Sequence, residues 1–206
     1  TAIPSSRADS AASVPYSAAL RHVAVIGADV AGAAVAHALV QRGVTVTVRD
    51  RGCGFDRAAP GAGRGLAESI VGRVERCGGT AVVVEDAWGE PVDPQKLEDA
   101  LKAHPDARVV AFIHAETSTG VQSDAKTLVE IAHKHDALTI VDAVTSLAGT
   151  PVLVDEWKID AIYSGSQKCL SCTPGLSPVS FSERVVDYVK ARKDKIHSWF
   201  MDMNLL

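Results

Sequence analysis

The sequence predicts an α/β fold, a doubly wound and mainly parallel sheet of seven strands with helices on both faces. Short apolar segments rich in β-branched residues alternate with amphipathic segments of helical period along most of the chain. Apolar residues make up 47% of the 206 residues, which is enough for a full buried core. Residues 21–50 also have the pattern of a βαβ unit, which requires two parallel strands.

The βαβ unit is predicted first along the chain. Residues 23–26 form a short apolar strand that runs into a glycine-containing turn, and residues 33–41 follow with a helical pattern that Gly43 ends. Residues 44–48 then alternate as a second strand, which leads to Asp50.

The later segments continue the alternation of strands and helices. A helix is expected over residues 65–77 and is closed by two glycines. Asp93 followed by Pro94 marks the start of another helix, because proline suits the first helical position. The predicted strands cover residues 80–85, 108–113, 137–141, 160–163 and 176–181, and the further helices cover 94–103, 124–135 and 182–192.

The βαβ unit carries a dinucleotide fingerprint with one departure. Gly27, Gly32 and the strand-ending acid Asp50 fit the pattern, but Asp29 stands where a second glycine lets the backbone approach a pyrophosphate. A charge pair at about 4 Å costs roughly 4 kcal/mol at an effective dielectric near 20. A helix N-terminus returns only about 0.3–2 kcal/mol. We therefore expect weak dinucleotide binding.

Residues 15–59 resemble the FAD-binding start of amino-acid-oxidase-like flavoproteins.

Two residues near the centre of the chain point to a different chemistry. Asp142 ends one strongly apolar segment and Lys168 follows the next, so both are expected at one edge of the sheet. Pyridoxal phosphate chemistry uses such a pair, because an anion keeps the pyridine nitrogen protonated and an amine forms the Schiff base. His114 closes a neighbouring strand and is a further candidate for contact with a ligand.

Residues from about 65 to 206 resemble the large domain of alanine–glyoxylate and serine–pyruvate aminotransferases, which are fold-type-I pyridoxal phosphate enzymes. The matching stretches are His114-Ala115-Glu116-Thr117-Ser118-Thr119-Gly120-Val121, Val141-Asp142-Ala143-Val144-Thr145-Ser146-Leu147, Ser164-Gly165-Ser166-Gln167-Lys168 and Ser198-Trp199-Phe200-Met201-Asp202. The resemblance implies that Lys168 is the Schiff-base lysine and that Asp142 is the partner of the ring nitrogen. It further implies cofactor contacts from Thr117 or Ser118, packing of Val144 on the ring and a place for Gln167 near the phosphate.

These two resemblances together suggest an engineered chimera, with a natural fusion or a fragment as the alternative origin. We expect a mobile leader over residues 1–20 and one α/β domain over residues 21–206. Residues 21–60 would supply the Rossmann part and residues 65–206 the aminotransferase part of that domain. Grafting the βαβ unit would place strand 1 between strands 2 and 4, giving the Rossmann-like order 3-2-1-4-5-6-7 with the last strand antiparallel.

Three functions follow from this interpretation. The first is a folded chimera without efficient activity and without a tightly bound cofactor, because the graft would remove the phosphate-binding helix. The second is a residual pyridoxal phosphate binder or weak aminotransferase of class V. The third is an FAD- or NAD-binding module. The sequence leaves these alternatives open.

Composition limits the partners. The net charge of −4 argues against nucleic-acid binding, and no apolar segment is long enough for a membrane span. We expect a soluble, cytoplasmic protein for which self-association is possible. Cys169 and Cys172 form a CxxC pair, but Cys53 and Cys77 supply no second pair for zinc, so we interpret all four as reduced thiols and expect no metal site.

Overall fold

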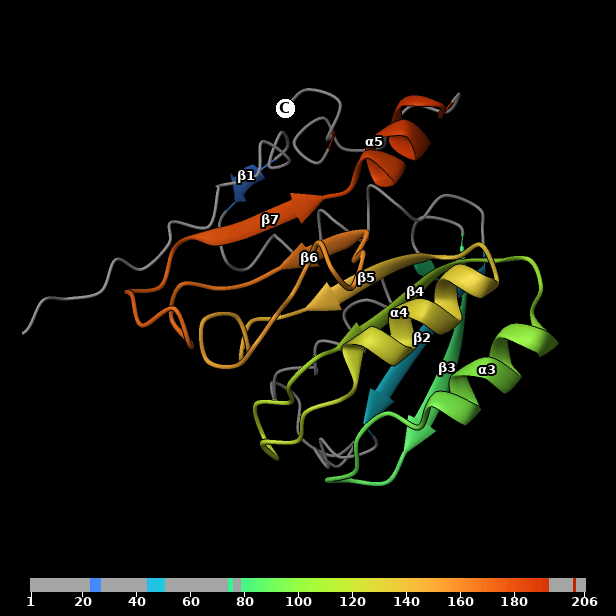
Figure 1. Cartoon of the computed structure of the whole chain (residues 1–206), viewed down its shortest axis with the longest axis horizontal. Coiled ribbons are helices and arrows are strands. Elements are labelled where there is room, and N and C mark those ends of the chain that lie inside the picture. The colour runs from blue at the N-terminus through green and yellow to red at the C-terminus, as the bar shows by residue number, and fades with distance from the viewer. Residues whose placement is uncertain (1–22, 27–43, 51–73, 76–78, 193–201, 203–206) are drawn as a thin grey trace, which may run out of the picture.

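The computed structural model of the chain describes residues 23–26, 44–50, 74–75, 79–192 and 202. Its centre is a seven-stranded sheet in the order β1-β7-β6-β5-β4-β2-β3 (Figure 1). Strands β2 to β6 are mutually parallel, whereas β7 runs antiparallel to both of its neighbours, β1 and β6. The strands are β1 (Val23–Ile26), β2 (Val44–Asp50), β3 (Thr80–Asp86), β4 (Ala107–Ile113), β5 (Leu138–Asp142), β6 (Ala161–Tyr163) and β7 (Ser177–Phe181).

The predicted strand order is wrong at one point. Strand β1 lies at the edge of the sheet beside β7, and β2 rather than β1 fills the place next to β4. The local βαβ pattern identifies two strands but not their neighbours, which depend on the free edges of the whole sheet. β2 has seven residues and pairs on both sides, while the four residues of β1 form a short edge strand.

Three helices that the sequence predicted are confirmed. They are α3 (Pro94–Ala103), α4 (Ala125–Lys134) and α5 (Glu183–Lys190). Each begins after a residue whose side chain accepts a backbone N–H from the first turn: Asp93 from Gln95, Asp124 from Thr127 and Ser182 from Val185. The helix predicted over residues 65–77 is described only at residues 74–75, where it is helical, and the one predicted over residues 33–41 lies outside the described residues.

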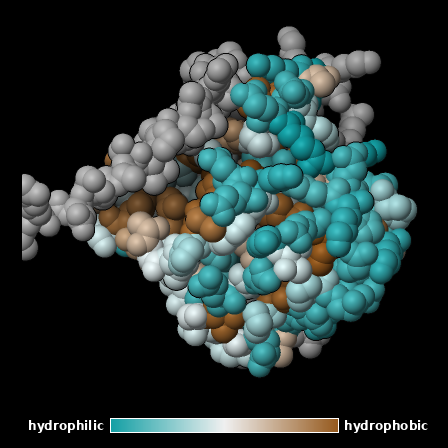
Figure 2. Space-filling view, in the orientation of Figure 1, coloured by the Kyte–Doolittle hydropathy of each residue, from teal (hydrophilic) through white to brown (hydrophobic). Residues whose placement is uncertain are grey.

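The sheet is covered on both faces. Helices α3 and α4 pack on one face (Figure 1), where Leu101 and Leu128 belong to the same buried core cluster as Val110 of β4. Helix α5 packs on the other face, where Val185 belongs to the same buried core cluster as Ala111. Ala111 and Val110 lie on different faces because successive residues of a strand point to opposite sides. The outer surface of α3 and α4 is mostly hydrophilic (Figure 2). Among the described residues, no helix is long and apolar enough to cross a membrane.

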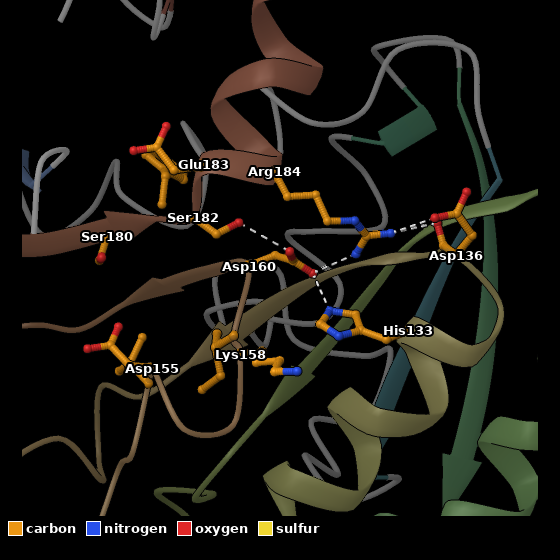
Figure 3. A pocket seen from close by; sticks show the side chains of 12 residues that line it. His133, Asp136, Asp155, Lys158, Asp160, Ser180, Ser182, Glu183 and Arg184 are labelled. Carbon is orange, nitrogen blue, oxygen red and sulfur yellow. Dashed lines mark hydrogen bonds and ion pairs between the residues drawn. The ribbon is translucent and has the colours of Figure 1, made fainter. Parts of the chain in front are cut away.

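One buried carboxylate joins four elements at the edge where β5 and β6 begin. Asp160, whose side chain is 2% exposed, accepts from the backbone N–H of Thr139 at 2.9 Å and lies 2.7 Å from His133 Nε2 at the end of α4. Arg184 of α5 donates to it at 3.2 Å, and the Ser182 hydroxyl donates at the same distance (Figure 3). The carboxylate thus fixes where β6 begins relative to β5 and to both helices.

We expect Asp160→Asn to lower the free energy of unfolding by about 3 kcal/mol, because the substitution leaves Arg184 and His133 without their buried anionic partner. Urea unfolding measures the change. Asp187→Asn, at an exposed position of α5, is the matched control and should shift the value by less than about 0.5 kcal/mol. Equal effects of the two substitutions would contradict the role given to Asp160.

Candidate active site

The candidate site lies along the side of the sheet formed by the C-terminal ends of the parallel strands β4, β5 and β6, which we call the edge of the site. Their register pairs Ile113 with Asp142 and Asp142 with Tyr163, so the last residues of the three strands lie side by side. Asp142 is the last residue of β5, and the segments that follow the three strands carry the other residues for which the sequence predicted pyridoxal phosphate chemistry. The structure therefore brings to one edge the groups that the sequence placed there.

Asp142 has a buried carboxylate that two hydrogen bonds hold in place at this edge. Its side chain is buried, with the residue 6% exposed, and it keeps two hydrogen bonds. The backbone N–H of Val144 donates to Oδ1 at 2.8 Å, and the Tyr163 hydroxyl donates to Oδ2 at 2.9 Å. Two donors hold the carboxylate in a fixed orientation at the end of β5.

Burial raises the pKa of Asp142 to about 6, and the nearby Glu116 carboxylate adds to the rise. The two hydrogen bonds act in the opposite direction but do not cancel the cost of removing a charge from water. Burial, together with the charge of Asp142, also raises the pKa of Tyr163, so its hydroxyl keeps its proton and remains a donor. A cation placed beside Asp142 would favour its ionised form.

The segment after β4 presents two hydroxyl groups. Residues 116–121 form a tight turn, in which Glu116 N–H donates to the Val121 carbonyl at 2.8 Å. The Ser118 hydroxyl donates to Glu116 Oε1 at 2.8 Å, and Thr117 Oγ1 lies 2.6 Å from Thr145 Oγ1. Both residues are exposed, so their hydroxyls are accessible to a ligand.

Val144 and Gln167 occupy different surroundings. Val144 is half-buried directly after the buried end of β5 and packs against the core on the α5 face. Gln167 is exposed in the turn that follows β6. Its side chain lies close to Gly165, because a Cβ added to that glycine would come 3.0 Å from Gln167 Oε1. Their predicted contacts with the ring and the phosphate stay predictions.

Lys168 lies in the turn that follows β6. The turn is closed by the N–H of Ser171, which donates to the Lys168 carbonyl at 2.9 Å. The Lys168 side chain is exposed and forms no hydrogen bond or ion pair with any residue in the part of the chain that the structure describes. Its amine is therefore accessible for chemistry.

His114 has a structural role in this arrangement. The residue is 1% exposed, and its Nδ1 lies 2.9 Å from the Ser146 hydroxyl. Its Nε2 lies 3.2 Å from Gln122 Nε2, and its ring meets the Trp157 ring edge-on. Burial lowers the pKa of His114, which favours the neutral ring. With both nitrogens occupied by the protein, His114 joins the segments after β4 and β5.

Tyr163 is the site residue that the sequence analysis missed. Its hydroxyl reaches Asp142 from the adjacent strand, and only the register of β5 and β6 makes this contact possible. A signal was present in the sequence, since an aromatic residue with a polar tip ends the strand that precedes Lys168.

Comparisons with known proteins show the family to which the chain belongs. The sequence pattern of the family described as aminotransferase class-V matches residues 70–191, well over half of the chain. The chain belongs to the class-V aminotransferase family. It is 44% identical over 120 residues to the (S)-ureidoglycine–glyoxylate transaminase of Bacillus subtilis, covering 58% of this chain and 28% of that protein. It is 37% identical over 132 residues to the alanine–glyoxylate aminotransferase of Drosophila melanogaster, covering 64% of this chain and 33% of that protein.

Solved structures extend the likeness. The ureidoglycine–glyoxylate aminotransferase of Bacillus subtilis superposes with a TM-score of 0.77 and 34% identity, covering 89% of this chain and 45% of that chain. An alanine–glyoxylate aminotransferase from Nostoc sp. gives a TM-score of 0.75 and 31% identity, covering 89% and 46%. The chain thus spans less than half the length of these relatives.

These comparisons favour the class V alternative over the chimera. The structural match covers more of the chain than residues 70–191, so the aminotransferase-like fold extends beyond the matched sequence pattern. The dinucleotide interpretation gains no support. Gly27, Asp29 and Gly32 lie outside the described residues. Asp50 ends β2, and a dinucleotide-binding unit needs that strand beside β1, whereas four strands separate them here.

In the cofactor-free protein, the free energy of unfolding should fall as the pH rises from about 4 to about 6. The folded state holds the Asp142 proton with a pKa near 6, above the ordinary value of 3.8, so deprotonation favours the unfolded chain across this window. Asp142→Asn should remove this dependence and be more stable at pH 8 by roughly 1–3 kcal/mol, with little difference at pH 4. Urea unfolding at a series of pH values measures it, and parallel curves for the two proteins would contradict it.

Tyr163→Phe should extend the pH range over which the free energy of unfolding falls, raising its upper limit by about one pH unit. The Asp142 carboxylate loses a donor that stabilises its charge, so its pKa in the folded protein rises further. The same unfolding series in the absence of cofactor measures the shift. Tyr188→Phe, which removes a hydroxyl at an exposed position of α5, is the matched control and should leave this pH range unchanged. An unmoved window in Tyr163→Phe would show that the hydroxyl does not act on Asp142.

Proposed function

We propose that this chain supplies the cofactor-binding part of a pyridoxal phosphate-dependent aminotransferase that uses a small 2-oxo acid such as glyoxylate as amino acceptor. The observation that carries the proposal is the Asp142 carboxylate, which is buried at the sheet edge yet lacks a cationic partner among the described residues. Such a group is suited to a cationic ring. The names of the relatives and solved structures described above support this choice of amino acceptor, since each of them includes glyoxylate.

The residues at this edge fit pyridoxal phosphate by their chemistry. Asp142 offers an oriented carboxylate for a protonated ring nitrogen, and Lys168 offers an accessible amine that would hold the cofactor covalently. Thr117 and Ser118 offer hydroxyl groups on a turn beside the end of β5. When bound, the cofactor supplies an electron sink for charge that develops at the substrate α-carbon.

Asp142 would keep the ring nitrogen protonated. Its burial makes the isolated carboxylate weakly acidic, but the same low-dielectric surroundings strengthen its attraction to a cation at contact distance. Tyr163 and the Val144 N–H hold the carboxylate so that it needs no reorganisation when charge develops on the ring. The pair of donors therefore contributes orientation as well as charge stabilisation.

Lys168 would have a second role after the substrate amine replaces it. A free amine beside the substrate α-carbon can take up and return a proton, which is the general acid–base work that transamination requires. The exposure of Lys168 and the absence of an ion pair with any described residue leave its amine available for that transfer.

Lys168 should be the lysine that pyridoxal phosphate labels first. The full chain is incubated with the cofactor, reduced with cyanoborohydride and mapped by peptide mass spectrometry. We expect label at Lys168 in the parent and in Lys126→Ala, an exposed lysine of α4, and loss of the preferred label in Lys168→Ala. Asp142→Asn should weaken cofactor binding by about tenfold or more, as expected for the loss of a charge-assisted contact. Label spread evenly over many lysines would refute the proposal.

A further inference from the structure

Two thiols lie in the turn that carries Lys168. Cys169 and Cys172 are both free; Cys172 is exposed, and Cys169 is half-buried. From the sequence alone, both are expected to be reduced thiols. Neither belongs to the apolar core clusters, and the exposed Cys172 is the thiol that a small molecule in solution can reach first.

The backbone of the turn brings its two ends back together. Besides the bond that closes the turn at Lys168, the N–H of Cys172 donates to the Ser166 carbonyl at 2.8 Å. Ser171 sits between them with a φ of +54°, in the left-handed region that reverses the chain direction. A CxxC pair spanning such a reversal has a short path to a disulfide, which requires Cα atoms about 4.4–6.8 Å apart.

In its present state each thiol is tied to a backbone carbonyl. Cys169 Sγ lies 2.9 Å from the Thr145 carbonyl oxygen, and Cys172 Sγ lies 3.3 Å from that of Leu170. The first contact joins the Lys168 turn to the segment after β5. The hydroxyl of Thr145 meets Thr117 at 2.6 Å, so Thr145 also links the segment after β4.

We propose that Cys169 and Cys172 form an oxidisable pair that closes to a disulfide by exchange with a small-molecule disulfide, and that closure displaces the turn bearing Lys168. The functional consequence rests on the proposed role of Lys168 as the lysine that holds the cofactor. The site of modification itself rests only on the two thiols and the geometry of their turn.

The exchange balances without a further oxidant. The exposed Cys172 thiolate attacks one sulfur of the small disulfide, forms a mixed disulfide and releases one thiolate. The Cys169 thiolate then attacks the sulfur of Cys172, and the second thiolate leaves. The two protons of the cysteines end on the two released thiols. The cysteines are oxidised and the small disulfide is reduced.

Closure must break the contact between Cys169 and Thr145, because a disulfide sulfur has no proton to donate. The Cys169 sulfur also lies close to the backbone of Gly149, because a Cβ built on that glycine would come 2.7 Å from the sulfur. Once the contact with Thr145 is lost, we expect the backbone on either side of Cys169 to shift, and Lys168 is the residue directly before it. Displacing a reacting group by about 1 Å can cost roughly 100-fold in rate.

The test uses the full chain with Cys53→Ser and Cys77→Ser, so that only the two turn cysteines remain. It is incubated with glutathione disulfide or with reduced glutathione, free thiols are blocked, and the peptides are mapped by mass spectrometry. We expect a linked Cys169–Cys172 peptide, lighter by two hydrogen atoms, in the oxidised sample only. Adding Cys169→Ser should stop the reaction at glutathione attached to Cys172.

The second readout is labelling of Lys168 by pyridoxal phosphate and cyanoborohydride, a reductant that leaves disulfides intact. Oxidation should lower the initial labelling rate by at least about tenfold, and a thiol reductant should restore it. Glutathione that stays on Cys172 of the parent, or a linked pair with unchanged labelling, would overturn the proposal. Absence of Lys168 labelling in the reduced protein would instead refute the proposed function, and the linkage alone would then decide the modification site.

Discussion

The parallel register of β4, β5 and β6 is the constraint on which the site depends. Asp160 fixes this register at the edge where β6 begins, through contacts with β5, α4 and α5. Three residues further along each of these two strands, the same register places Tyr163 beside Asp142 at the opposite end of the strands. A polar cluster on one side of the sheet therefore determines the geometry of a carboxylate on the other. The pairing is rigid because both faces of these strands are packed.

Much of this arrangement could be predicted from the chain itself. The alternation of strands and helices predicted α3, β4, α4 and β5 to within a residue or two, because each has a clear hydrophobic pattern and the two helices also have a capping residue. The edge location of Asp142 and Lys168 followed from the rule that parallel strands end on the same side. Local patterns were sufficient wherever a neighbour in sequence is also a neighbour in space.

The features that the sequence predicted wrongly or did not predict depend on residues that are far apart in the chain. The place of β1 depends on which sheet edges remain free once all the strands have formed, so the pattern of residues 21–50 could not determine it. The contact between Tyr163 and Asp142 joins residues 21 positions apart, and the bridge between Thr145 and Cys169 joins residues 24 apart. A polar residue at a strand end is visible in a sequence, but its partner across the sheet is a property of register.

Gly149 shows how far such a constraint can extend from the groups that react. The residue is exposed, and an exposed position in a loop ordinarily accepts many side chains over the course of evolution. Any side chain here would press on the sulfur of Cys169 at 2.7 Å and on its Cβ at 3.1 Å. The position should consequently be intolerant of variation although it faces solvent. Inherited or engineered changes at this glycine would impair the protein through the adjoining Lys168 turn while leaving the hydrophobic core intact.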